Sequence, residues 1–141
     1  MMKVKIINEL AHIPTYGSEN AACADLYSTI TTSILPGHSI KIPLGICLEI
    51  PDGYCGLIFA RSSMGIKEHL RPSNCVGVID SDYRGEVCMD LYNDSNEIKY
   101  IEVSQRIGQI MFLPVSQFNF EVVDKLNETV RGDGGFGSTG K

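Results

Sequence analysis

The chain has 141 residues, a length that fits one domain able to bury about 68% of the surface of its unfolded form. Its formal net charge is −5, with twelve Lys plus Arg and no basic run, so the composition argues against a nucleic-acid partner. Hydrophobic residues make up 43% of the chain, and no apolar run approaches the ~18 residues of a membrane span. We therefore expect a globular protein that binds neither nucleic acid nor membranes.

The beginning of the chain and its cysteines indicate the cellular compartment. Glu9 interrupts the first apolar residues, so we expect no secretory signal and a cytoplasmic location, or the nucleus or a virion for a eukaryotic or viral source. The cysteines are odd in number and contain no Cys-x-x-Cys pair, which argues against a disulfide framework and against a zinc site. We expect reduced, mostly buried thiols at Cys23, Cys47, Cys55, Cys75 and Cys88.

Taken in order, the chain alternates short apolar segments with turn signals. The composition of residues 21–28 is compatible with a helix, but the β-branched residues that follow favour a strand. Ser62 or Ser63 is a candidate N-cap for one short helical turn. The segments with strand character are 3–7, 29–34, 39–50, 54–60, 76–79, 86–92, 98–103, 106–113 and 118–123. About nine strands and at most one short helix are typical of an all-β sandwich, jelly roll or distorted barrel.

The end of the chain differs in composition from the rest. Residues 127–141 hold five of the fourteen glycines and almost no apolar side chain. In isolation such a segment is disordered, because it cannot bury enough apolar surface to offset the entropy of ordering. We expect a β domain over residues 1–126 and a flexible C-terminal arm over residues 127–141.

Residues 74–92 have the pattern of a β-hairpin with a polar tip. Along the return strand, Val87, Met89 and Leu91 alternate with polar residues, which is typical of a half-buried strand. The outgoing strand ends at Asp80, and the glycine-closed polar turn 81–85 follows it. This arrangement places a carboxylate at the end of a strand.

The spacing inside this segment suggests a binding site. Asn74 and Asp80 are an even number of residues apart, so one uninterrupted strand would point both side chains to the same face. Gly77 lies midway, and a glycine inside a strand often marks a bulge or a close backbone approach. The segment could hold a small planar ligand beside a carboxylate. The alternative is an ordinary hairpin with a solvated acidic turn.

The tripeptide Arg61-Ser62-Ser63 is a candidate anion site. It follows an expected strand, so its backbone amides, hydroxyls and guanidinium can converge on a phosphate. The alternative is a capped turn with a surface arginine.

Gln109 interrupts an apolar strand and must find hydrogen bonds or cost ~1–3 kcal/mol. A structural amide and a ligand contact both satisfy that requirement.

The glycine-rich residues 131–140 form a second candidate anion site. Glycines let backbone amides wrap closely around a phosphate, and Ser138 and Thr139 add donors. Phe136 offers a flat apolar face against which a nucleobase can stack. The alternative is a flexible tail with no binding role.

Together and in this order, the segments resemble the five motifs of the homotrimeric dUTPase family, the dUTP nucleotidohydrolases. The motifs correspond to residues 21–28, 60–65, 76–86, 106–109 and 131–140. The resemblance implies a jelly-roll-like distorted barrel and a homotrimer whose three active sites form between subunits, with the C-terminal arm closing over a site. It also implies hydrolysis of dUTP to dUMP and pyrophosphate, which keeps uracil out of DNA and supplies dUMP for thymidylate synthesis.

The resemblance further implies roles for residues of the third motif. Asp80 would be the general base that activates a water for attack on the α-phosphate. Tyr83 would pack under the deoxyribose and leave no space for a 2′-hydroxyl. The uracil would be bound between the two strands by the side chain or backbone of Asn74, Gly77, Val78, Ile79 and Cys88.

The other motifs would bind the phosphates and cover the base. The phosphate-binding residues implied are Arg61, Ser62, Ser63, Gln109, Arg131, Ser138 and Thr139. Phe136, followed by Gly137, would cover the uracil. Family members use Mg²⁺ bound by the triphosphate and by water, so the resemblance implies Mg²⁺ without a direct protein ligand, with Asp25 near Arg61 and near the metal through water.

A few positions depart from the family pattern, namely Cys23, Ala24, Ser63 and Gly108. Arg-Ser-Ser also resembles the second motif of the dCTP deaminases, which share the fold. A deaminase would have an arginine where this chain has Ile66, and a catalytic glutamate instead of an aspartate at the hairpin. A dCTP deaminase-like enzyme and a non-catalytic regulatory protein with the same fold are the alternatives.

Overall fold

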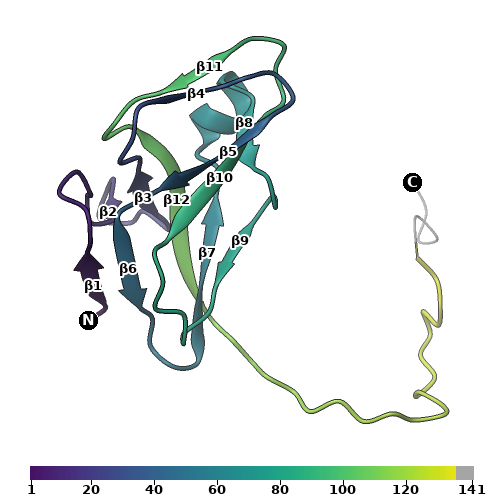
Figure 1. Ribbon diagram of the computed structural model, residues 1–141. Coiled ribbons are helices and arrows are strands. Elements are labelled where there is room, and N and C mark those ends of the chain that lie inside the picture. Colours follow the sequence, from purple (N-terminus) through teal and green to yellow (C-terminus); the bar gives the residue numbers. More distant parts are fainter. Residues whose placement is uncertain (136–141) are drawn as a thin grey trace.

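The computed structural model describes residues 1–135, which are almost entirely β (Figure 1). The elements are β1 (Lys3–Ile6), β2 (Thr15–Tyr16), β3 (Ala24–Tyr27), β4 (Thr32–Ile34), β5 (Ser39–Pro43), β6 (Ile46–Glu49), β7 (Tyr54–Phe59), η1 (Ser63–Lys67), β8 (Leu70–Pro72), β9 (Gly77–Ile79), β10 (Cys88–Asn93), β11 (Lys99–Ile101) and β12 (Arg106–Pro114). Within residues 1–135, no helix has the length and apolar character needed to cross a membrane. The predicted all-β class with one short helix is confirmed.

The strands form several short antiparallel sheets around one core. The largest sheet has the order β2-β3-β12-β7-β9, and a second has the order β5-β10-β8. Two strand pairs, β1 with β6 and β4 with β11, complete the wall. Because short sheets twist and close over a shared core, the result is the distorted barrel expected from the sequence.

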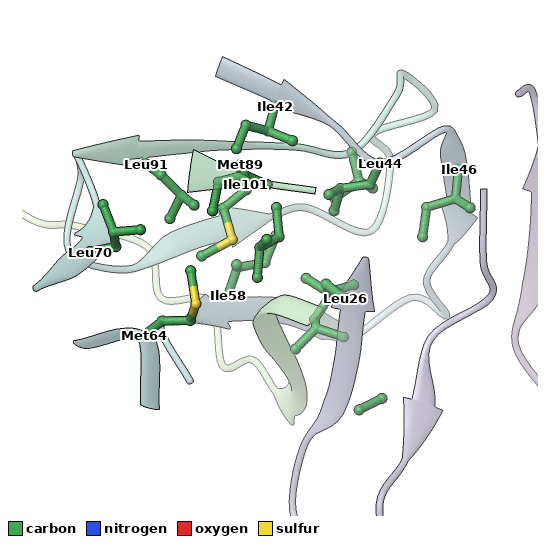
Figure 2. Close-up of a cluster of buried hydrophobic side chains, with 14 of the residues drawn as sticks. Leu26, Ile42, Leu44, Ile46, Ile58, Met64, Leu70, Met89, Leu91 and Ile101 are labelled. Atoms are coloured by element: carbon green, nitrogen blue, oxygen red, sulfur yellow. The ribbon is translucent and has the colours of Figure 1, made fainter. Parts of the chain in front are cut away.

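Aliphatic side chains from most strands fill the barrel. Figure 2 shows this cluster, in which Leu26 of β3 and Ile58 of β7 face Met89 and Leu91 of β10. Val87, Met89 and Leu91 are fully buried, so the alternation predicted for this strand is confirmed. Each such side chain contributes about 1.5–3 kcal/mol by leaving water, and the core therefore fixes which face of β10 points outward.

The apolar segment 39–50, expected as one strand, is divided into β5 and β6. Gly45 lies between them with a φ of +68°, a conformation that residues with a side chain rarely adopt. A Cβ at this position would meet the Cβ atoms of Ala11 and Asn8 at 2.7 Å. The chain therefore turns where the backbone passes close to the loop after β1.

Strands β9 and β10 do not form the hairpin that the sequence predicts. β9 pairs with β7, with Gly77 opposite Ile58, whereas β10 pairs with β5 and, at Leu91–Asn93, with β8. The two strands thus belong to different sheets. Periodicity identifies a strand and its buried face, but the neighbour is chosen by strands elsewhere in the chain.

The strand expected over residues 118–123 is absent from the described part of the chain. The N–H of Val115 donates to the carbonyl of Gly53 at 2.8 Å, and the following residues run away from the barrel (Figure 1). Phe120 and Val122 are almost fully exposed. A strand exists only with a neighbour to pair with, and this segment lies beside none.

The short helix lies where the sequence places it, but it starts differently. η1 is a π-helical turn with Ser62 at its N-cap position, and the Ser62 side chain makes no capping hydrogen bond. Ser62 has helical backbone angles, with φ at −55° and ψ at −41°, whereas a capping residue has β-region angles. The expected capping role is therefore wrong, and the Ser62 hydroxyl remains exposed.

Candidate functional site

A narrow slot separates β9 from β10. It has a volume of about 190 Å³, and its walls include Asn74, Gly77, Val78, Ile79 and Cys88, all predicted from the sequence to bind one ligand. β9 is the edge strand of its sheet, and its second edge has no strand partner within residues 1–135. The slot therefore lies between two strands that belong to different sheets.

The backbone of β10 also faces the slot. The carbonyl of Asp90 accepts a hydrogen bond from Ser73 N–H at 2.8 Å on the side of β8. Residues two apart in a strand direct their backbone groups to the same edge, so those of Cys88 point the same way. β8 reaches only to Leu91, which leaves the Cys88 edge open to the slot.

A second cavity of about 250 Å³ adjoins the slot and contains Asp80 and Tyr83. The two cavities share Val78, Ile79 and Cys88 as walls. Asp80 directly follows β9 and is exposed, so water reaches its carboxylate. Along β9 from Gly77, the slot therefore comes first, and Asp80 and Tyr83 lie at its mouth.

The turn after Asp80 holds Tyr83 in place. Tyr83 N–H donates to the Asp80 carbonyl at 3.2 Å, and the Tyr83 hydroxyl donates to the Glu86 carbonyl at 3.0 Å. A Cβ at Gly85 would collide with the Tyr83 ring and hydroxyl. Gly85 is needed here because only a residue without a side chain lets the ring fold over the turn.

Lys41 of β5 lines both cavities, and sequence reasoning missed it. It lies opposite Asp90 in the register of β5 with β10. Burial, followed by the nearby Glu86 carboxylate, raises the pKa of the Cys88 thiol, and the Lys41 charge acts in the opposite direction. No sequence signal marks Lys41, because the pairing of β5 with β10 is a tertiary feature.

A second group of predicted residues gathers where β3, β12 and the end of β7 meet. Asp25 of β3, which is 9% exposed, binds Arg61 Nε through Oδ1 at 2.9 Å and Arg106 Nη1 through Oδ2 at 3.1 Å. Gln109 Nε2 donates to the Ala60 carbonyl at 3.1 Å. We call Asp25, Arg61, Arg106 and Gln109, with Ser62 and Ser63 that follow Arg61, the arginine cluster.

The sheet register explains why these residues meet. Gln109 lies opposite Asp25 in β3 and opposite Phe59 in β7, so the three positions form one row across the sheet. Arg61 follows Phe59 by two residues and bends back to Asp25. The cluster is cationic, with two guanidinium groups and one carboxylate, and is suited to bind an anion.

The arginine cluster and Asp80 lie far apart within one chain. β9 runs antiparallel to β7, so Asp80 lies beyond the pair Ile79–Gly56, whereas Arg61 lies beyond the other end of β7. The strand separation from residue 55 to residue 61 amounts to roughly 20 Å at about 3.3 Å per residue. One chain therefore does not bring its own Asp80 to its own Arg61.

The fifth predicted segment is described only in part. Arg131 Nε donates to the Gly134 carbonyl at 2.9 Å, and Gly134 N–H donates to the Arg131 carbonyl at 3.1 Å, which closes a small turn. This turn belongs to the segment that leaves the barrel (Figure 1). The predicted site residues Phe136, Gly137, Ser138 and Thr139 lie outside the described residues.

The acidic side chains near the two groups are dispersed. Among residues 1–135, no three His, Cys, Asp or Glu side chains lie together in a way that could hold a metal ion. Asp25 is the carboxylate of the arginine cluster, and both of its oxygens are engaged by guanidinium groups.

Comparisons with known proteins agree with the five motifs. A sequence model of the dUTPase family matches residues 9–140. The deoxyuridine 5'-triphosphate nucleotidohydrolase of Escherichia phage T5 is 45% identical over 148 residues, covering 99% of each chain. The enzyme of the same name from Desulfitobacterium hafniense strain DSM 10664 / DCB-2 is 42% identical over 146 residues, covering 99% of this chain and 97% of its own.

A solved structure agrees at the level of the fold. The dUTPase of Staphylococcus bacteriophage 80alpha, solved with dUPNHPP, superposes with a TM-score of 0.93 at 26% sequence identity and covers 100% of this chain and 99% of its own. The family model spans all five motifs, and the relatives match over nearly their full length. On these grounds, the chain belongs to the dUTPase family.

Proposed function

We propose that the protein hydrolyses dUTP to dUMP and pyrophosphate. The observation that carries the proposal is the slot between β9 and β10, which opens beside Asp80 and Tyr83. Membership in the dUTPase family and relatives named as dUTP nucleotidohydrolases support it. Nothing in the described residues favours the deaminase-like or the non-catalytic alternative.

Uracil occupies the slot in this proposal. Its N3–H group and two carbonyls have the donor and acceptor pattern of a peptide edge, so the open backbone of β9 and Cys88 can pair with it. Asn74 supplies an amide at the same wall. The close walls of the slot would contact the added methyl group of thymine, and Tyr83 at its mouth would contact a 2′-hydroxyl.

Asp80 acts as the general base. Its exposed carboxylate accepts a proton from a water molecule as the water oxygen attacks the α-phosphorus. The bond between the α-phosphorus and the bridging oxygen to the β-phosphate breaks, and pyrophosphate leaves with that oxygen. The arginine cluster of another chain is cationic and suited to hold the charge of the leaving group.

The two halves of the site come from different chains of a homotrimer. The separation of roughly 20 Å between Asp80 and Arg61 along β7 supports this part of the proposal, because the α-phosphate and the leaving group of one nucleotide lie much closer together. Residues 115–135 leave the barrel and can reach another subunit (Figure 1). In that position Arg131, Phe136, Gly137, Ser138 and Thr139 close over the nucleotide.

Mg²⁺ accompanies the substrate. The triphosphate and water would supply its ligands, and the ion would neutralise charge on the phosphates. Asp25 binds Arg61 and would lie near the ion through water in this arrangement. The protein's own contribution is the pair of guanidinium groups beside the phosphates.

A panel of nucleoside triphosphates with Mg²⁺ tests the proposed function. We expect pyrophosphate release from dUTP, with dTTP, dCTP and UTP as poor substrates. The slot and Tyr83 disfavour the added groups of dTTP and UTP by size, and cytosine has the opposite donor and acceptor pattern to uracil at positions 3 and 4. Comparable kcat/KM values for UTP and dUTP would contradict the assignment. Ammonia released from dCTP would identify a deaminase, and no turnover of any nucleotide would identify a non-catalytic protein.

A further inference from the structure

Strand β12 contains a β-bulge between Arg106 and Gly108. Arg106 lies opposite Tyr27 of β3, and Gln109 lies opposite Asp25, two residues earlier in that strand. In a regular strand Arg106 and Gln109, three residues apart, would point to opposite faces. The extra residue of the bulge restores them to the same face, so Arg106 joins Asp25 and Gln109.

Asp25 binds one arginine with each of its oxygens. Its side chain is 13% exposed, whereas Arg61 is 26% and Arg106 is 50% exposed. A carboxylate with one partner can still rotate about its terminal torsion, which has a broad energy minimum. The contact from Arg106 to Oδ2 fixes the plane of the carboxylate and thereby the direction of Oδ1.

The contact between Asp25 and Arg61 uses the Nε atom of Arg61. The outer fork of the guanidinium, formed by Nη1 and Nη2, is not used in this ion pair, and its geometry suits two phosphate oxygens. A rotation of the carboxylate would rotate this fork as well. The orientation of Arg61 therefore depends on what holds the far oxygen of Asp25.

Resting on the proposed function, we propose that Arg106 is a positioning residue for phosphate binding, which fixes the Asp25 carboxylate so that Asp25 aims Arg61 at the triphosphate. In this proposal Arg106 acts on phosphate binding through Asp25 and Arg61 and not through a phosphate contact of its own.

A double-mutant cycle separates action through Arg61 from a direct contact. The variants are Arg106→Gln, Arg61→Gln and the double substitution, and the measurement is kcat/KM for dUTP. We expect Arg106→Gln to lower kcat/KM about tenfold, mainly through KM, because the remaining Arg61 binds phosphate in more orientations. In the Arg61→Gln background we expect the same substitution to change kcat/KM less than about twofold.

Ligand binding and conservative variants sharpen the test. Arg106→Gln should weaken binding of dUpNHpp and leave binding of deoxyuridine unchanged, because deoxyuridine has no phosphates. Arg106→Lys, which keeps the charge without the planar fork, should recover part of the loss. Lys3→Gln is the matched control, since it breaks an ion pair of similar length with Glu49 on the β1–β6 pair, which holds none of the proposed site residues, and it should change none of these values.

Each other outcome overturns the proposal. An equal loss in both backgrounds would make Arg106 an independent phosphate contact, and no loss would make it a surface ion pair. A loss for deoxyuridine, or a fall in melting temperature beyond that of Lys3→Gln, would make its role structural. If the wild type released no pyrophosphate from dUTP, the proposed function would fail, while the binding of dUpNHpp would still decide the role of Arg106.

Discussion

The slot between β9 and β10 is built from backbone groups, whereas the arginine cluster is built from charged side chains. The walls of the slot are backbone edges left open because two strands belong to separate sheets. The arginine cluster consists of charged side chains held by a mostly buried carboxylate. The slot should therefore tolerate side-chain changes that keep the backbone in place, whereas the arginine cluster should fail when one charge is lost.

Asp80→Asn tests the chemistry at the mouth of the slot and has the largest expected effect. The amide is close in size to the carboxylate, so the fold and the binding of dUpNHpp should persist. Turnover should fall by ~10²–10⁴, the contribution of a positioned general base, because an amide cannot accept the proton of water. Steady-state kinetics and calorimetric binding measure both parts, and turnover within a few-fold of wild type would rule out Asp80 as the base.

Deletion of residues 131–141 tests whether activity requires the C-terminal arm in addition to the slot and the arginine cluster. Turnover should fall by on the order of 10²-fold, because correct placement of the phosphates depends on closure of the arm. Stability should change little, since Gly132, Asp133 and their neighbours bury almost no apolar surface in the described part of this segment. Melting temperature and activity distinguish the two effects.

Mixing this deletion with Asp80→Asn shows whether the parts come from different chains. After subunit exchange, some mixed trimers would contain one intact Asp80 and one intact arm at the same site, so activity should return. If each arm closes over Asp80 of its own chain, no mixture contains a complete site. Absence of recovered activity after exchange, verified by mass spectrometry, would contradict the arrangement in trans.

Asp25→Asn tests the arginine cluster with a smaller expected effect. The amide keeps the shape but removes the negative charge between Arg61 and Arg106, which are then two cations without a carboxylate. We expect KM for dUTP to rise about tenfold and the free energy of unfolding to fall by about 1–3 kcal/mol. Binding of deoxyuridine should be unchanged, and a loss there would show that the two regions are not independent.

Cys88→Ala tests the slot and has the smallest expected effect. Only the backbone of Cys88 faces the bound base in the proposal, so kcat/KM for dUTP should stay within about twofold of wild type. Because burial and Glu86 raise the pKa of the thiol, little thiolate exists near pH 7, and alkylation should be slow there and accelerate as the pH rises. Rapid alkylation at pH 7, or a large loss of activity on substitution, would contradict this picture.

The sequence predicts which face of a strand is buried better than it predicts which strands pair with each other. The alternation of Val87, Met89 and Leu91 correctly identifies the buried face of β10, because burial leaves a period of two in any strand. The same pattern wrongly joins β9 to β10, since periodicity does not specify which strand pairs with which. The slot, with Gly77 and Cys88 on its walls, exists because that pairing is absent.

Contacts between residues of different segments are the hardest to predict. Arg61 and Gln109 are found from local chemistry, but Arg106 reaches Asp25 only through a bulge, which the sequence does not reveal. Lys41 becomes a wall of both cavities only through the pairing of β5 with β10. Long-range register therefore limits how much of such a site can be predicted from one sequence.

The open edge of β9 has a consequence for the solubility of the protein. An unpaired strand edge is a template on which other chains can add strands and aggregate, and proteins usually shorten, charge or cover such edges. β9 has only three residues, and the carboxylates of Asp80 and Asp82 follow it at once. The edge cannot be covered permanently without closing the slot, so shortness and negative charge are the protection that a binding site of this kind can retain.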